Sequence, residues 1–64
     1  MPDITINNHG SILIFVPTTE VGMEWMHENI DPGAMRWAGG IVVEPRYAAD
    51  IVNGAVSDGL QVEG

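Results

Sequence analysis

Apolar and polar residues alternate at the start of the chain and predict a hairpin of two strands. The segment DITIN at 3–7 places Ile4 and Ile6 on one face, as in a half-buried strand. Asn-Asn-His-Gly at 7–10 favours a turn, because asparagine and glycine tolerate positive φ at little cost. SILIFVP at 11–17 then places five consecutive apolar residues before a proline, so the second strand is expected to be apolar on both faces.

A first amphipathic helix is expected over residues 20–30. Thr18-Thr19-Glu20 offers a hydroxyl cap followed by an acid in the first turn, and Asp31-Pro32-Gly33 indicates the end of the helix. At helical spacing one side carries glutamates with His27 beside them. The opposite side carries the apolar residues Val21, Met23, Trp25, Met26 and Ile30.

A third strand and a second helix follow. Ile41-Val42-Val43 is typical of a strand, and apolar residues at helical spacing run from Arg46 to about Asp58. Gly59 stands where a left-handed C-terminal cap is expected, and Leu60 is the apolar residue that packs back onto the helix.

The expected order of elements is β-β-α-β-α, with a possible last strand at 60–62. Residues 35–40 are either a loop or the start of a strand kinked by two glycines. A right-handed crossover favours a third strand parallel to the second, unless the residues after the first helix reverse the direction. The sequence therefore predicts one α+β domain over residues 1–64, with a small mixed sheet of three to four strands packed against two amphipathic helices.

Both faces of the central strands are apolar, but two short helices are enough to cover only one. An uncovered apolar face is rarely left in water. A symmetric homodimer that buries this face is the simplest expectation, and it would help a chain of 64 residues, whose own core is marginal. The alternative is that the helices straddle the sheet, one on each face.

The charge balance narrows the classes of partner. Nine Asp and Glu residues stand against two Arg and no Lys, which gives a formal net charge of −7. Such a chain repels phosphate backbones, so nucleic acid is not expected as a partner and a basic protein is favoured. The alternative is that the charge only keeps the chain soluble.

The compartment is expected to be the cytoplasm. The chain has no cysteine, which fits a reducing environment. Its N-terminus lacks the basic start and apolar stretch of a signal peptide. The longest apolar run is far shorter than the about 20 residues that span a bilayer, so no membrane partner is expected.

Glu24-x-x-His27 followed by Glu28 has the acid-and-imidazole spacing of some helical metal sites. A metal site in a helical bundle needs ligands from several helices that project into a core, whereas these side chains lie opposite the apolar side. We therefore expect a solvated helical face, no bound metal and no cofactor.

An acidic stripe is the clearest candidate for a binding surface. Glu20, Glu24 and Glu28 recur at every fourth position with no basic residue at the intervening helical spacings. Like charges at this spacing cost a helix a few tenths of a kcal/mol per pair. The stripe is therefore either presented to a basic partner or simply solvated.

Catalytic patterns are absent from the sequence. Ser11 and Ser57 lack the G-x-S-x-G context of a nucleophile elbow, and Gly39-Gly40 lacks the lysine and following helix of a phosphate loop. The protein is therefore not expected to be an enzyme, and no catalytic residue is assigned.

Three further residues indicate a possible interface or pocket. Trp37 belongs either to the core or to an interface, and a pocket is expected near Trp37, Arg36 and Arg46 if the protein binds a small molecule. Arg46 opens a helix, where a cation opposes the helix dipole, so it is expected to pair with Glu44 or Asp50.

The segment VEPRYAADIVNGAVSDGL at 43–60 is the most specific of several motifs, and His9-Gly10-Ser11, Glu24-Trp25 and Trp37-x-Gly39-Gly40 accompany it. Together these motifs resemble those of small acidic proteins of tailed bacteriophages, prophages and proteobacterial genomes. The resemblance covers nearly the whole chain. It implies a phage or mobile-element setting, hence the host-cell cytoplasm, and it carries over no activity, cofactor or site residue.

These observations favour a non-enzymatic accessory protein that binds a basic host protein through its acidic surface. It would act by occlusion, as an anti-defence inhibitor or a nucleic-acid mimic. A small-molecule or nucleotide-signal binder with a pocket near Trp37, Arg36 and Arg46 is the second hypothesis. A structural accessory component is the third.

Overall fold

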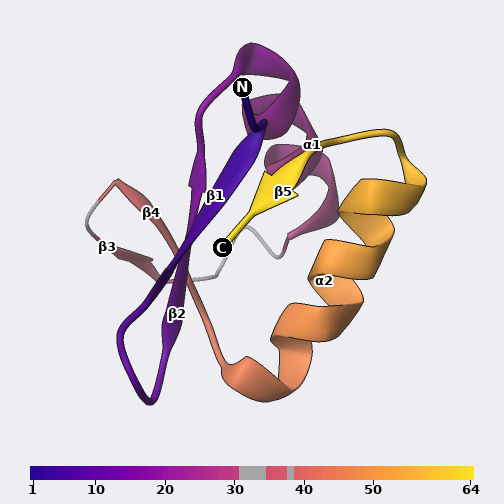
Figure 1. Ribbon diagram of the computed structural model, residues 1–64. Helices are drawn as coiled ribbons and strands as arrows, with labels where there is room; N and C mark the ends of the chain where they lie inside the picture. The colour runs from indigo at the N-terminus through magenta and orange to yellow at the C-terminus, as the bar shows by residue number, and fades with distance from the viewer. Residues whose placement is uncertain (31–34, 38) are drawn as a thin grey trace.

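A five-stranded mixed sheet with two helices on it forms the fold (Figure 1). The computed structural model describes residues 1–30, 35–37 and 39–64. In chain order the elements are β1 (Ile4–Asn8), β2 (Leu13–Pro17), α1 (Glu20–Asn29), β3 (Arg36–Trp37), β4 (Gly40–Val43), α2 (Pro45–Ser57) and β5 (Val62–Glu63). The strands are arranged β3-β4-β2-β1-β5. The α+β prediction is confirmed, but the sheet has five strands, whereas the sequence predicted three to four.

The direction of β4 differs from the sequence prediction. β4 is the third strand that the sequence predicted, at 41–43. It runs antiparallel to β2, with Val43 opposite Leu13, so the prediction of a parallel strand is wrong. The reason lies in β3, which pairs antiparallel with β4 and places Trp37 opposite Gly40. The chain leaves α1, forms the edge strand and then turns back at Gly39, whose φ of +78° suits a tight turn.

Strand alternation assigns the core to one face of the sheet. Ile4, Phe15 and Val43 point to the same side and belong to the main core cluster. The same cluster contains residues of both helices, namely Trp25, Met26, Ala48 and Ala55. Both helices therefore cover one face, as Figure 1 shows, and they do not straddle the sheet.

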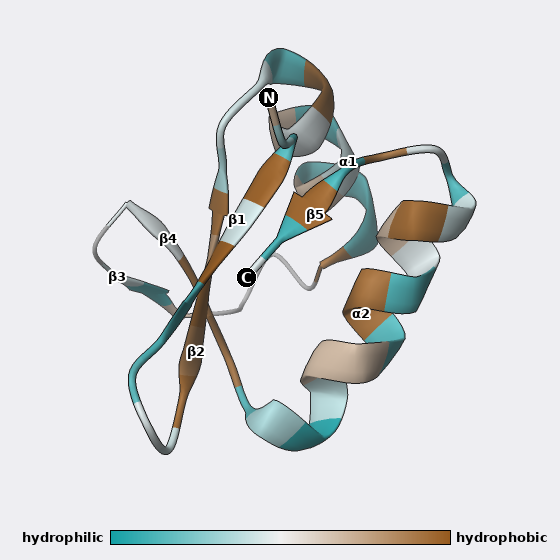
Figure 2. Ribbon diagram, viewed as in Figure 1, coloured by the Kyte–Doolittle hydropathy of each residue, from teal (hydrophilic) through white to brown (hydrophobic). Residues whose placement is uncertain are grey.

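The other face carries no helix among the residues that the structure describes. Ile14 on this face is fully buried, while Val16 and Val42 are half-buried and Trp37 is 54% exposed. Apolar residues concentrate in the central strands and alternate with polar ones along α2 (Figure 2). The homodimer that would bury the uncovered face stays a prediction.

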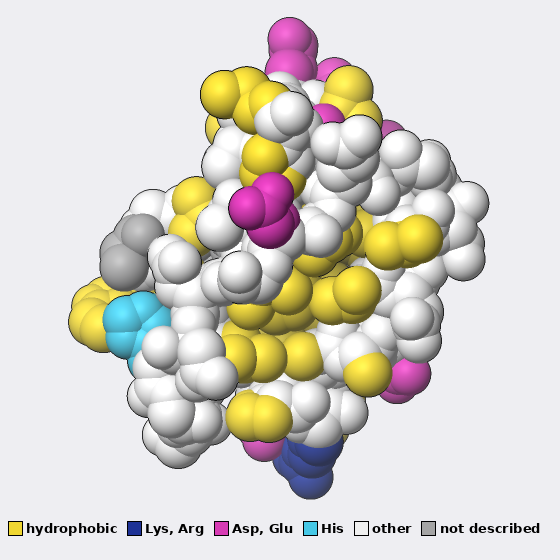
Figure 3. Space-filling model, in the orientation of Figure 1, with side chains coloured by type: hydrophobic (Ala, Val, Ile, Leu, Met, Phe, Trp, Pro, Cys, Tyr) yellow, Lys and Arg dark blue, Asp and Glu magenta, His cyan; other side chains and the backbone are white. Residues whose placement is uncertain are grey.

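Hydrophobic side chains also reach the surface between the strands and α2. Figure 3 shows them gathered in the middle of the molecule on the side that it presents. The partly buried residues that pack around the core include Ile6, Leu13, Ile51, Val52 and Val62. In the part of the chain that the structure describes, neither helix is long and apolar enough to cross a bilayer.

The ends of the helices follow the sequence prediction where they are described. Thr19 is the N-cap of α1, and its hydroxyl accepts a hydrogen bond from the Gly22 amide at 3.1 Å. After α2, the Gly59 amide donates to the Val56 carbonyl and the Leu60 amide to the Ala55 carbonyl, which is the Schellman pattern. The helix-stop expected at 31–33 lies outside the described residues.

The Asp3 side chain links the N-terminal segment to the C-terminal segment and to the start of α1. One carboxylate oxygen accepts a hydrogen bond from the Gln61 amide at 2.9 Å, and the other accepts one from the Thr19 hydroxyl at 2.7 Å. The Gln61 bond first, and then the Thr19 bond, hold the pKa of Asp3 below its ordinary value of 3.8. The ionised carboxylate is therefore favoured in the folded state.

Replacing this carboxylate is expected to make stability respond differently to pH. A carboxyl group whose pKa is lowered by folding contributes stability above its unfolded pKa, and that contribution is lost as the pH falls through the folded pKa. Asp3→Asn should therefore melt a few degrees below wild type at pH 7, with the gap closing below pH 3.8. Thermal unfolding of both proteins from neutral to acid pH measures this difference. A gap that persists unchanged in acid would contradict the assignment, and exposed Asp50→Asn is the control.

Candidate functional site

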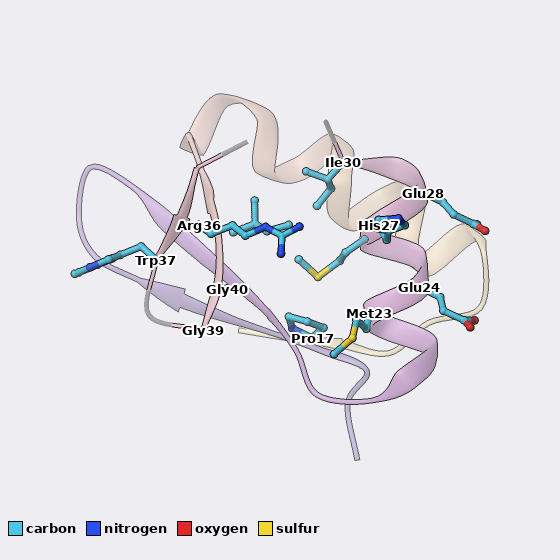
Figure 4. A pocket seen from close by; sticks show the side chains of 12 residues that line it. Pro17, Met23, Glu24, His27, Glu28, Ile30, Arg36, Trp37, Gly39 and Gly40 are labelled. Atoms are coloured by element: carbon cyan, nitrogen blue, oxygen red, sulfur yellow. The ribbon is translucent and has the colours of Figure 1, made fainter. Parts of the chain in front are cut away.

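A groove of about 810 Å³ lies between α1 and the β3–β4 hairpin (Figure 4). Its volume falls within the range of about 300–1,000 Å³ that is usual for small-molecule sites. Residues from the end of β2, α1, β3 and β4 line it: Pro17, Met23, Glu24, Met26, His27, Glu28, Ile30, Arg36, Trp37, Gly39, Gly40 and Ile41.

The walls of the groove are mainly apolar. Met26 is almost fully buried, Ile30 and Ile41 are half-buried, and Met23 is 60% exposed at the mouth. Figure 4 shows Met23 and Pro17 at one end of the groove and Ile30 at the other. Methionine side chains adapt readily to ligands of irregular shape, so this wall is suited to an apolar group.

Arg36 enters the groove from the sheet side. It pairs with Ile41 across β3 and β4, so its side chain is on the same face of the sheet as the helices. In Figure 4 it projects from β3 toward α1. Among the described residues Arg36 has no ion-pair partner, whereas the Arg46 Nε atom lies 3.2 Å from a carboxylate oxygen of Glu44.

Of the three predicted pocket residues, Arg36 and Trp37 both line the groove and Arg46 does not, so the three side chains do not converge on one point. Trp37 follows Arg36 in β3, and its side chain points to the opposite side of the sheet (Figure 4). There its ring meets the His9 ring edge-on, with the ring centroids 5.2 Å apart. Arg46 lies at the start of α2, with its guanidinium 4.8 Å from the centre of the Tyr47 ring. The expected pairing of Arg46 with Glu44 is confirmed.

The acidic stripe lies on the exposed side of α1. Glu20, Glu24 and Glu28 are all exposed, and in the part of the chain that the structure describes none of them forms an ion pair. Figure 4 shows Glu24 and Glu28 pointing away from the sheet and from Arg36. Because His27 lines the groove while these two carboxylates point outward, the acid-and-imidazole spacing does not converge on one point.

The sequence did not reveal the groove itself. The sequence predicted that Arg36 and Trp37 belong to a possible interface or pocket. Which of the two side chains faces α1 depends on β3, a strand of two residues in a segment that the sequence left open as a loop or the start of a strand. Met23 and Met26 were assigned to the apolar side of the helix without any indication that part of this side stays open. The helical spacing of these two methionines, together with the nearby Arg36 in the sequence, is the signal that could have indicated the groove.

Comparison of the chain with protein-family models, with curated proteins and with solved structures finds no match. The resemblance to small phage proteins stays a prediction. The function is therefore inferred from the surfaces of the molecule.

Proposed function

We propose that the protein is a non-enzymatic interaction protein that binds a basic partner through the outer side of α1. Three exposed carboxylates, Glu20, Glu24 and Glu28, occupy this side without an ion-paired cation among the described residues, and this observation carries the proposal. A partner with Lys or Arg at matching positions would relieve the repulsion between them. Binding would occlude a basic surface of the partner, such as a groove that otherwise holds nucleic acid.

The overall charge supports this proposal. A formal net charge of −7 on 64 residues attracts a basic surface over long range and accelerates its association. The resemblance to phage and prophage proteins would make the partner a host protein in the cytoplasm. A homodimer formed through the uncovered sheet face would leave α1 free, because α1 covers the opposite face.

The experiment compares capture of basic proteins from a proteobacterial extract by wild type and by a variant with Glu20, Glu24 and Glu28 changed to glutamine. We expect the wild type to retain a specific protein at low salt and to release it at about 0.5 M salt, where exposed charges are screened. The variant should retain little of it at any salt concentration.

A matched control separates the stripe from the overall charge. Three exposed acids elsewhere in the chain are changed in the same way, removing the same charge: Glu44→Gln, Asp50→Asn and Glu63→Gln. This control variant should capture the partner nearly as well as wild type. Equal loss in both variants would show that net charge alone causes retention and would overturn the proposal.

A further inference from the structure

We propose that the groove between α1 and the β3–β4 hairpin binds a small amphipathic anion, with an apolar body and one carboxylate or similar acidic group. This site borders the acidic side of α1, because Glu24 and Glu28 stand at its rim, but it does not depend on the function proposed above. The proposal rests on the position of Arg36, the apolar walls and the direction of the neighbouring carboxylates.

The anionic group is assigned to Arg36. Its guanidinium projects into the groove from β3 and has no ion pair among the described residues (Figure 4). A guanidinium offers parallel N–H donors that match a carboxylate in a two-point contact. His27 also lines the groove and is a second possible donor to the ligand.

The apolar body is assigned to the wall formed by Met23, Met26, Ile30 and Ile41. These side chains come from the groove side of α1 and from β4, and they line the space around Arg36. A mainly apolar cavity with very few charged groups is the usual architecture of a small-molecule site, in which the polar groups set the orientation of the ligand.

The acidity of the chain does not exclude an anion from this groove. Glu24 and Glu28 are at its rim, but their carboxylates point outward, away from Arg36 (Figure 4). Among the described residues that line the groove, Arg36 is therefore the charged side chain that projects into it.

The test uses two probes with the same apolar body and opposite charge, 4-phenylbutyrate and 4-phenylbutylamine. Each is titrated into isotopically labelled protein, and the amide chemical shifts are followed by NMR. We expect 4-phenylbutyrate to shift amides of α1, β3 and β4 at the groove, and to bind at least about tenfold more tightly than the amine. Absence of binding by the anion, tighter binding of the amine, or shifts confined to other surfaces would each overturn the proposal.

The two arginines provide a matched pair of variants. Arg36→Gln should weaken binding of 4-phenylbutyrate by about tenfold or more, whereas Arg46→Gln, outside the groove and already paired with Glu44, should leave it unchanged. Equal effects of the two changes would overturn the assignment of the anion to Arg36.

A second pair of variants leaves Arg36 intact. Met23 and Val21 are both exposed on α1, at 60% and 56%, but only Met23 lines the groove. Met23→Glu places a carboxylate at the mouth and should reduce binding strongly, whereas Val21→Glu should not. The variant with Glu20, Glu24 and Glu28 changed to glutamine should still bind 4-phenylbutyrate. The two proposals can therefore fail independently, and the experiments show which of them has failed.

Discussion

Gly22→Ala is expected to destabilise the protein by about 3 kcal/mol, although alanine is normally the better helix former. A Cβ atom at Gly22 would lie 2.1 Å from the carbonyl oxygen of Asp3 and 2.9 Å from its carbonyl carbon. These are backbone atoms that cannot rotate away, and the same oxygen accepts a hydrogen bond from the Thr18 amide. α1 would have to move away from the start of β1.

Gly54→Ala is the matched control for this prediction. Gly54 is also inside a helix, but its Cβ would meet only the Trp25 ring, at 3.4 Å, which is ordinary contact. The gain in helix propensity should then dominate and raise the free energy of unfolding by up to about 1 kcal/mol. Urea unfolding of both variants measures the difference. A Gly22→Ala protein as stable as wild type would contradict the packing of α1 against Asp3.

Trp25→Ala is expected to remove most of the stability of the fold. The indole is almost fully buried between the two helices, and its Nε1 donates a hydrogen bond of 2.6 Å to a carboxylate oxygen of Asp58. Truncating a buried tryptophan costs about 3–5 kcal/mol. A chain of this size has a total stability of roughly 3–10 kcal/mol, so a large share of the molecules should be unfolded.

Two further variants test this prediction: one isolates the hydrogen bond of Trp25, and the other is a control at an exposed tryptophan. Trp25→Phe keeps an aromatic ring but loses the hydrogen bond to Asp58, which is worth about 1 kcal/mol. Trp37→Ala removes a tryptophan that is 54% exposed on the uncovered face and should cost less than about 1 kcal/mol. Chemical unfolding measures all three changes. Similar losses at Trp25 and Trp37 would contradict a core on one side of the sheet.

Local chemistry was enough to predict most elements of the fold. The Thr19 cap and the turn at Gly59 with Leu60 depend on residues adjacent in sequence, and both are found as predicted. The direction of β4 was not predictable in this way, because it depends on pairing between Arg36–Trp37 and a strand that begins only three residues later. A strand of two residues leaves no clear periodicity in the sequence.

The same short strand explains why the groove was not predicted. Helical spacing alone separates Glu20, Glu24 and Glu28 from the apolar side of α1, so the exposed acidic stripe follows from the sequence. The register of β3 decides whether the Arg36 or the Trp37 side chain lies on the face of the sheet that the helices cover, since neighbouring strand residues point to opposite faces. That register is a property of the folded sheet.

Site-specific photo-crosslinking tests most directly whether α1 is the surface that meets a partner. Val21 was expected on the apolar side of α1, but it follows Glu20 directly and is 56% exposed, as is Val56 on α2. Replacing either valine with a photo-reactive residue leaves every carboxylate in place. In a proteobacterial extract, we expect a discrete adduct from position 21 that disappears at high salt, and none from position 56. Equal adducts from both positions, or an adduct from position 56 alone, would contradict a binding surface on α1.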